Sequence, residues 1–190
     1  MPVEIDELNI QVAERMRSSY FGKYRGLVKN VDDPLKIGRV TAQVPEVFGE
    51  EECPWALPAV PFAGSKHGLV LIPEVDDGVW IEFEAGDISR PIWTGCWWAS
   101  DELDDVSKTK TRALVTTKGH KLVLDDDAEE IHLLHSKGAE IKMSGDDITL
   151  TIGGTEIKLT KNDMTLKSGS GEIKLSASGV DINNGALKAM

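Results

Sequence analysis

The C-terminal half of the chain repeats one pattern of apolar and polar residues every 16 positions. A Glu-Ile-Lys string followed by Met or Leu begins at 140, 156 and 172, and apolar-polar-apolar triplets stand between these strings at 148–150, 164–166 and 180–182. Alternate residues of a strand point to opposite faces, so each unit predicts two short strands with one apolar and one polar face. Gly, Asp, Asn and Ser fill the intervals, as in tight turns.

The apolar face of these strands needs a partner. Its residues are Ile141, Met143, Ile148, Leu150, Ile157, Leu159, Met164, Leu166, Ile173, Leu175, Val180 and Ile182. Burying each side chain contributes roughly 1.5–3 kcal/mol, whereas ordering the backbone costs roughly 1–2 kcal/mol for every residue. We therefore expect a homotrimer, an intertwined triple-stranded β-helix with these residues on the axis and strand edges paired between chains. A single-chain β-solenoid and a plain antiparallel meander are the alternatives.

Residues 20–98 follow another pattern, with short runs rich in Val, Ile, Trp and Phe between Gly and Pro. Strands are expected at 23–31, 37–44, 56–60, 69–72, 79–84 and 91–97. A small barrel suits so many short strands, because closure removes free sheet edges. All five tryptophans, at 55, 80, 93, 97 and 98, lie here and are expected to fill the centre of the barrel.

The remaining segments complete the predicted organisation. Residues 3–17 place Ile5, Leu8, Val12 and Met16 on one helical stripe, which predicts an amphipathic helix within residues 1–19. The stripe packs on its own domain or on a partner, and we favour its own domain. Residues 99–111 are polar and predict a linker between the barrel at 20–98 and the repeat region at 112–190. The fold class is therefore all-β with one short helix.

Charge and hydropathy narrow the possible functions. The formal net charge is −11, and both halves of the chain are negative, which disfavours nucleic acid as a partner. No apolar run is long enough for a spanning helix, and the sequence does not begin like a secretory signal, so we expect assembly in the cytoplasm. Cys53 and Cys96 lack metal-ligand spacing, and we interpret them as reduced thiols, with a disulfide as the alternative.

The histidines are candidate ligands that we interpret as solvated side chains. His132 and His135 are close in sequence to a group of carboxylates, but residues three apart in a strand face opposite sides. His67 and His120 stand beside glycines without a nucleophile motif. We expect no catalytic, cofactor or metal site, and no enzyme activity.

Several strings in the barrel region resemble a known family. These are Tyr24-Arg25-Gly26-Leu27-Val28, Ile37-Gly38-Arg39-Val40, Pro54-Trp55-Ala56, Pro58-Ala59-Val60-Pro61 and the run from Ile72 to Trp98, in which the hallmark positions are Pro73, Val75, Gly78, Val79, Phe83, Gly86, Asp87, Pro91 and Gly95. They are similar to the barrel signature of the central spike proteins of contractile injection systems, which include contractile phage tail spikes, VgrG proteins and the spikes of phage-tail-like particles. Asp76 stands where many relatives carry glycine.

The resemblance implies an OB-fold barrel and a mechanical role. Three copies would join a separate trimeric hub protein at the end of the tail tube and carry a needle that passes transiently through a target membrane. No lysozyme domain lies between barrel and needle, and the chain ends without histidine, which is similar to spikes capped by a PAAR-type tip protein. Gly185, Ala186, Leu187 and Met190 would dock that tip. The alternatives are an OB-fold nucleic-acid-binding protein and a cell-wall hydrolase accessory protein.

Overall fold

The computed structural model describes residues 2–103 and 108–189, and its contacts divide the chain into two units between Glu102 and Leu103. Residues 104–107 of the expected linker and Met190 of the expected docking segment lie outside the described residues. Both units are built from β-strands apart from short helical segments, so the all-β class is confirmed. No helix in the described part of the chain is both long and apolar enough to cross a membrane.

The N-terminal unit begins with the predicted helix, α1 (Pro2–Arg17). Leu8, Val12 and Met16 of its apolar stripe are all more than half exposed. The expectation that the stripe packs on its own domain is therefore wrong for these three side chains. A stripe of this kind is stabilised only by a surface that covers it.

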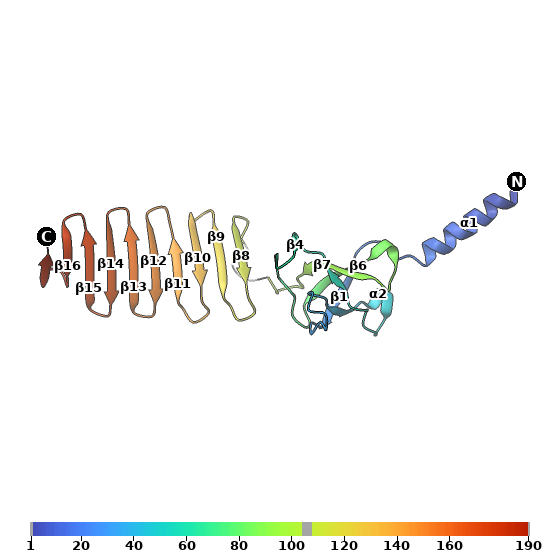
Figure 1. Ribbon diagram of the computed structural model, residues 1–190, viewed down its shortest axis with the longest axis horizontal. Coiled ribbons are helices and arrows are strands. Elements are labelled where there is room, and N and C mark those ends of the chain that lie inside the picture. Colours follow the sequence, from blue (N-terminus) through green and yellow to red (C-terminus); the bar gives the residue numbers. More distant parts are fainter. Residues whose placement is uncertain (1, 104–107, 190) are drawn as a thin grey trace. The chain divides into compact units, whose positions relative to one another are not determined.

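A curled five-stranded sheet forms the OB-type part of this unit (Figure 1). Its strands lie in the order β2 (Thr41–Gln43), β1 (Tyr24–Asn30), β6 (Gly78–Phe83), β7 (Pro91–Trp97) and β3 (Leu57–Pro58). Neighbours are antiparallel except β3 and β7. Between them lie α2 (Pro45–Phe48), the small hairpin of β4 (Ala63–Gly64) and β5 (His67–Gly68), and the 3-10 turn η1 (Glu84–Gly86).

Two of the six predicted strands differ most from the structure. Residues 69–72 form no strand, and their apolar side chains are exposed because no neighbouring strand pairs with them. The strand expected at 37–44 is shortened to β2, since Lys36 and Gly38 have φ values of 53° and 79° and bend the chain before it. The short strands 41–43 and 57–58 are extended only by the isolated bridge between Val40 and Ala56.

Small side chains fill the core of the barrel. Val28, Val40, Ala42, Val44, Ala56, Val79 and Ile81 are fully buried, with Cys53, Phe83 and Trp93 beside them. The expectation that five tryptophans fill the centre is wrong, because only Trp93 is buried there. Trp98 is 69% exposed, and Trp80 and Trp97 lie against the guanidinium of Arg25. The interior of so small a barrel has room for β-branched residues rather than for several indoles.

An ion pair closes the loop between β1 and β2. Asp33 is 8% exposed and accepts hydrogen bonds from the backbone amides of Leu35, Ile37 and Arg39. The guanidinium of Arg39 donates to the same carboxylate at 2.6 and 2.9 Å. This guanidinium, with the backbone amides, holds the pKa of Asp33 far below its usual range. Arg39 also lies over the ring of Trp55, so the ion pair joins this loop to a second part of the sequence.

The C-terminal unit is a single ten-stranded sheet in which every strand pairs with its sequence neighbour (Figure 1). The strands are β8 (Thr111–Val115), β9 (Lys121–Asp125), β10 (Glu130–Leu134), β11 (Glu140–Met143), β12 (Asp147–Ile152), β13 (Thr155–Thr160), β14 (Asp163–Ser168), β15 (Gly171–Ser176), β16 (Gly179–Ile182) and β17 (Leu187–Ala189). We call these strands the C-terminal sheet.

The expected pairing of strand edges between chains is therefore corrected to an antiparallel meander within the chain. The connections explain the difference. Ile152 pairs directly with Thr155, and Ser168 with Gly171, which leaves only two residues for each turn. A two-residue connection forms a hairpin and cannot carry the chain to another face of a prism. Gly153 and Gly169 have φ values of 56° and 58°, as such turns require.

Candidate functional site

Two uninterrupted rows of apolar side chains cross the C-terminal sheet on one face. Cross-strand pairing places Leu114, Leu122, Leu133, Ile141, Leu150, Ile157, Leu166, Ile173, Ile182 and Leu187 in one row. The second row contains Leu124, Ile131, Met143, Ile148, Leu159, Met164, Leu175 and Val180. We call these two lines the apolar rows. All twelve residues that the repeat marks as a trimer core lie in them.

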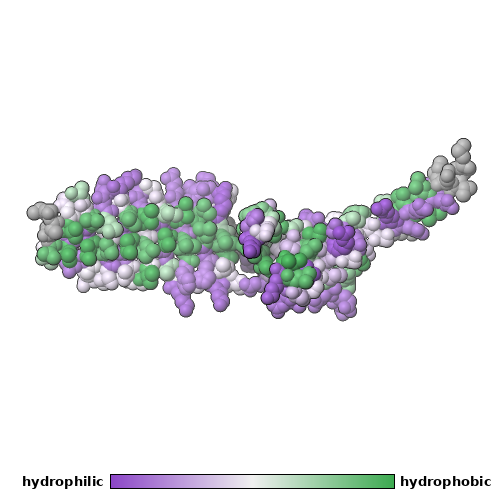
Figure 2. Space-filling model, in the orientation of Figure 1, coloured by the Kyte–Doolittle hydropathy of each residue, from purple (hydrophilic) through white to green (hydrophobic). Residues whose placement is uncertain are grey.

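Among the residues that the structure describes, none covers this face. None of the side chains in the apolar rows is buried, and Ile141, Ile148, Leu159 and Leu175 are each more than a third exposed. Figure 2 shows the apolar residues as a continuous band along the C-terminal sheet, with polar residues along both of its margins. A contiguous apolar surface of this extent, rimmed by polar residues, is typical of a protein interface.

The opposite face carries a ladder of ion pairs whose lysines recur every 16 residues. Lys142 pairs with Glu130 at 2.5 Å, Lys158 with Asp147 at 2.6 Å and Lys174 with Asp163 at 2.8 Å. We call these three pairs the lysine ladder. The carboxylates raise the pKa of each lysine, and the lysines lower the pKa of each carboxyl. One face of the sheet thus carries the lysine ladder, whereas the apolar rows lie on the other.

The turns that join these strands are fixed by hydroxyl groups at equivalent positions. The Ser144 hydroxyl accepts from the backbone amides of Asp146 and Asp147, and the Thr160 hydroxyl accepts from those of Asn162 and Asp163. Asp147 and Asp163 therefore end a turn and also belong to the lysine ladder. This coupling of turn and ladder sets the register of each hairpin.

The candidate ligands do not come together. The two ring nitrogens of His132 lie 2.7 and 2.8 Å from carboxylate oxygens of Glu140 and Glu130, while His135 stands in a turn beside His120. Among the described residues, no three His, Cys, Asp or Glu side chains are grouped as metal ligands require. Cys53 is buried, Cys96 is exposed, and both are free thiols.

The expected docking segment lies at the last hairpin of the sheet. Asn183, Asn184 and Gly185 adopt positive φ values there, and the Gly185 amide donates to the Asp181 carboxylate. Leu187, which begins β17, is 63% exposed.

Sequence reasoning missed two features of the chain. It left Leu114 out of the apolar rows, because the residues around it do not follow the 16-residue period; only its alternation with Arg112 marked it as a strand residue. It also missed the pairing of Asp33 with Arg39. The preference of an aspartate before a turn for nearby backbone amides was the available signal.

Comparison with known protein families agrees with this division into a barrel and a sheet. Residues 24–98 match the type VI secretion system/phage-baseplate injector OB domain. Residues 112–188 match the phage baseplate V C-terminal trimerisation domain, so the region that contains the apolar rows is one through which related chains form trimers. No curated protein matches the chain in a sequence search.

Proposed function

The chain belongs to the baseplate V family of phage and type VI secretion spike proteins, and from this premise we propose that three copies form the load-bearing spike of a contractile injection machine. The family supports a structural role in a phage tail or injection particle. The observation that carries the proposal is the pair of uncovered apolar rows. One row runs without a polar interruption through all ten strands, from Leu114 to Leu187, and the other through eight strands, from Leu124 to Val180.

Three sheets of this kind can enclose their apolar rows as the walls of a triangular prism. The twelve residues from Ile141 to Ile182 would then form the trimer core, and the lysine ladders would face water on the outside. Each strand remains hydrogen-bonded to its neighbours within its own chain, so axial load is carried by backbone ladders as well as by side-chain packing. A slender prism with polar walls is suited to push through an envelope as a needle.

The two ends of the chain would hold the other partners. We assign the contact with a trimeric hub to the N-terminal unit, whose helix α1 leaves Leu8, Val12 and Met16 exposed. We assign a PAAR-type tip to Gly185, Ala186 and Leu187, where an exposed leucine follows a polar turn. Met190, which belongs to the same assignment, lies outside the described residues.

Substitution of Ile157 by Asp tests the trimer. Ile157 pairs with Leu150 and Leu166 in the middle of one apolar row, so the variant would place three carboxylates in one layer of the core. Burial of unpaired charge costs several kcal/mol. We expect the amount of trimer at micromolar concentration, measured by gel filtration with light scattering, to fall by more than about tenfold.

Thr165→Asp is the matched control. Thr165 lies on the opposite face of the neighbouring strand, between Lys158 and Lys174 in register, where a new carboxylate meets two cations. This variant should remain trimeric. If the Ile157→Asp variant gives as much trimer as the wild type, the proposed core is wrong. If the wild type is a folded monomer at micromolar concentration, the proposed spike is wrong.

A further inference from the structure

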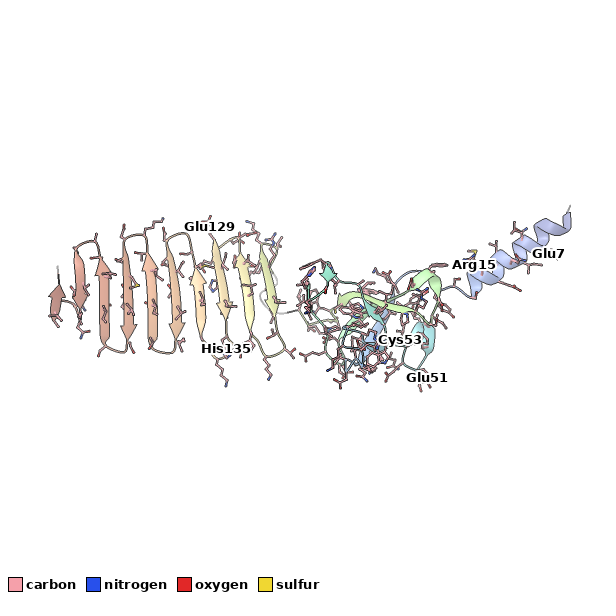
Figure 3. The ribbon with its side chains drawn as sticks, viewed as in Figure 1. Glu7, Arg15, Glu51, Cys53, Glu129 and His135 are labelled. Carbon is pink, nitrogen blue, oxygen red and sulfur yellow. The ribbon has the colours of Figure 1, made fainter. Side chains whose placement is uncertain are left out.

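The two long margins of the C-terminal sheet carry opposite charge near its first strands. The turn between β9 and β10 contains Asp126, Asp127 and Glu129, and we call it the acidic turn. The turns β8–β9 and β10–β11 contain Lys118 and His120, and His135 and Lys137, and we call them the basic turns. Figure 3 places Glu129 and His135 at opposite margins of the sheet.

Part of this charge is not neutralised within the chain. Asp126 pairs with Arg112, and Asp127 pairs with Lys110 at 2.7 Å. Glu129, Lys118 and Lys137 are exposed and form no ion pair within the described part of the chain. One carboxylate at one margin and two ammonium groups at the other are therefore available to a neighbouring molecule.

Each of the two turns that carry the free lysines also carries a histidine. The rings of His120 and His135 have centroids 4.4 Å apart and join the basic turns to each other. Each Nδ1 accepts a hydrogen bond from a backbone amide, that of Ser136 for His120 and that of Lys137 for His135. A neutral histidine whose Nδ1 is an acceptor carries its proton on Nε2, which can donate to a carboxylate. The basic turns thus combine cations and donors that suit an acidic group.

The heights of the turns along the sheet also match. The acidic turn joins β9 to β10, whereas the basic turns join β8 to β9 and β10 to β11. Measured across the strands of the sheet, the acidic turn therefore lies midway between the two basic turns, one strand spacing from each. Neighbouring strands are about 4.8 Å apart. In a threefold arrangement of three sheets, each corner joins one margin to the other margin of the next copy, because cyclic contacts are heterologous. At equal height, the acidic turn of one chain faces the gap between the two basic turns of its neighbour.

We infer that the acidic turn of each chain docks between the basic turns of the next copy, with Glu129 against His120 and His135 and between Lys118 and Lys137. This inference rests on the proposed trimer and specifies how its corners join. Exposed ion pairs add little to stability, but they select which surfaces meet, since two like margins repel. The charged corners therefore determine which margins meet and how the three sheets align along the axis. The apolar rows supply the apolar surface that the trimer buries.

Disulfide trapping tests the corner directly. In a Cys96→Ser background, Glu129→Cys is combined with Lys137→Cys in one protein and with Lys118→Cys in another. Within one chain the two positions are at opposite margins, about 16 Å apart for a five-residue strand, and a disulfide needs Cα atoms less than about 7 Å apart. We expect oxidation to convert at least one of the two variants mainly into covalent trimer on non-reducing gels, because each chain is linked to both neighbours.

A pair at the wrong height is the matched control. Ser170 lies in a neutral turn on the same margin as His135, four strands farther along the sheet, so Glu129→Cys with Ser170→Cys should give less than about a tenth of the covalent trimer. The background protein controls for Cys53. If gel filtration shows trimer but neither pair links, or if the control pair links equally, the inferred corner is wrong and the proposed spike stands. If every variant and the wild type are monomeric, the proposed function fails and the inference fails with it.

Discussion

Asp76 occupies a backbone conformation that glycine usually supplies. Its φ is 72°, its amide donates to the Val28 carbonyl, and its carboxylate lies 3.3 Å from the Lys29 ammonium. The resemblance to spike proteins leaves the conformation of this turn open, because many relatives have glycine here. The structure shows that the turn keeps its left-handed residue although the side chain has changed, since aspartate tolerates this region better than most residues.

Two substitutions at Asp76 should separate backbone strain from the lost ion pair. Asp76→Gly and Asp76→Val both remove the carboxylate, but only valine adds a β-branched side chain at positive φ. We expect the valine variant to lose roughly 1–2 kcal/mol of unfolding free energy relative to the glycine variant. Urea denaturation followed by tryptophan fluorescence measures this, because every tryptophan lies in the barrel region. Equal stability of the two variants would show that the turn is not constrained as described.

At the scale of the element, the lysine ladder gives the C-terminal sheet a defined pH dependence. Glu130, Asp147 and Asp163 have lowered pKa values in the folded chain, so their contribution is complete above the usual carboxyl pKa of about 4 and is lost as pH falls. Lys142, Lys158 and Lys174 have raised pKa values, so their contribution is complete below about pH 10 and is lost above it.

We therefore expect the thermal midpoint of the sheet, followed by far-UV circular dichroism, to be flat between about pH 5 and 9 and to fall on both sides. The double variant Asp147→Asn, Asp163→Asn should start from a lower plateau and lose less on acidification than the wild type. The hydroxyl groups of Ser144 and Thr160 still accept hydrogen bonds from the backbone amides of the same turns in this variant, so the hairpin turns are kept. If the thermal midpoint of the double variant falls as much below about pH 5 as that of the wild type, the acid sensitivity does not come from these carboxylates.

The elements of the C-terminal sheet were largely predictable because each strand repeats the same alternation. The strings at 140, 156 and 172 lie in β11, β13 and β15, and the triplets at 148–150, 164–166 and 180–182 lie in β12, β14 and β16. The route of the chain between strands was not predictable from this period, because a trimeric helix and a meander place apolar pairs at the same spacing. The turn residues decide it, since Gly153 and Gly154 leave room only for a hairpin.

The structure of the barrel was less predictable from the sequence than that of the C-terminal sheet. The segment 69–72 has the composition of a strand, yet it forms none, and composition alone cannot reveal that no neighbouring strand pairs with it. The tryptophans misled for a related reason. Their size suggested a core, whereas Trp80 and Trp97 use their faces to hold Arg25 at the surface.

At the scale of the whole molecule, association and folding of the C-terminal sheet should be one process. The uncovered apolar rows mean that a lone sheet leaves one complete face in water, so its stability depends on partners through mass action. We expect the thermal midpoint of the sheet to fall by several degrees when the protein is diluted a hundredfold. Circular dichroism at several concentrations measures this, with barrel fluorescence recorded in parallel. A midpoint independent of concentration would mean that the sheet is stable alone.

The constant register between successive hairpins makes length an adjustable property of this molecule. Each 16-residue unit adds two strands, which lengthen the sheet by about 10 Å. Each unit pairs with the following unit in the same register in which it pairs with the preceding one. Duplication or deletion of a whole unit would preserve the cross-strand register on either side of the change. The length of the C-terminal sheet can therefore change during evolution by whole units, while its first and last strands stay the same.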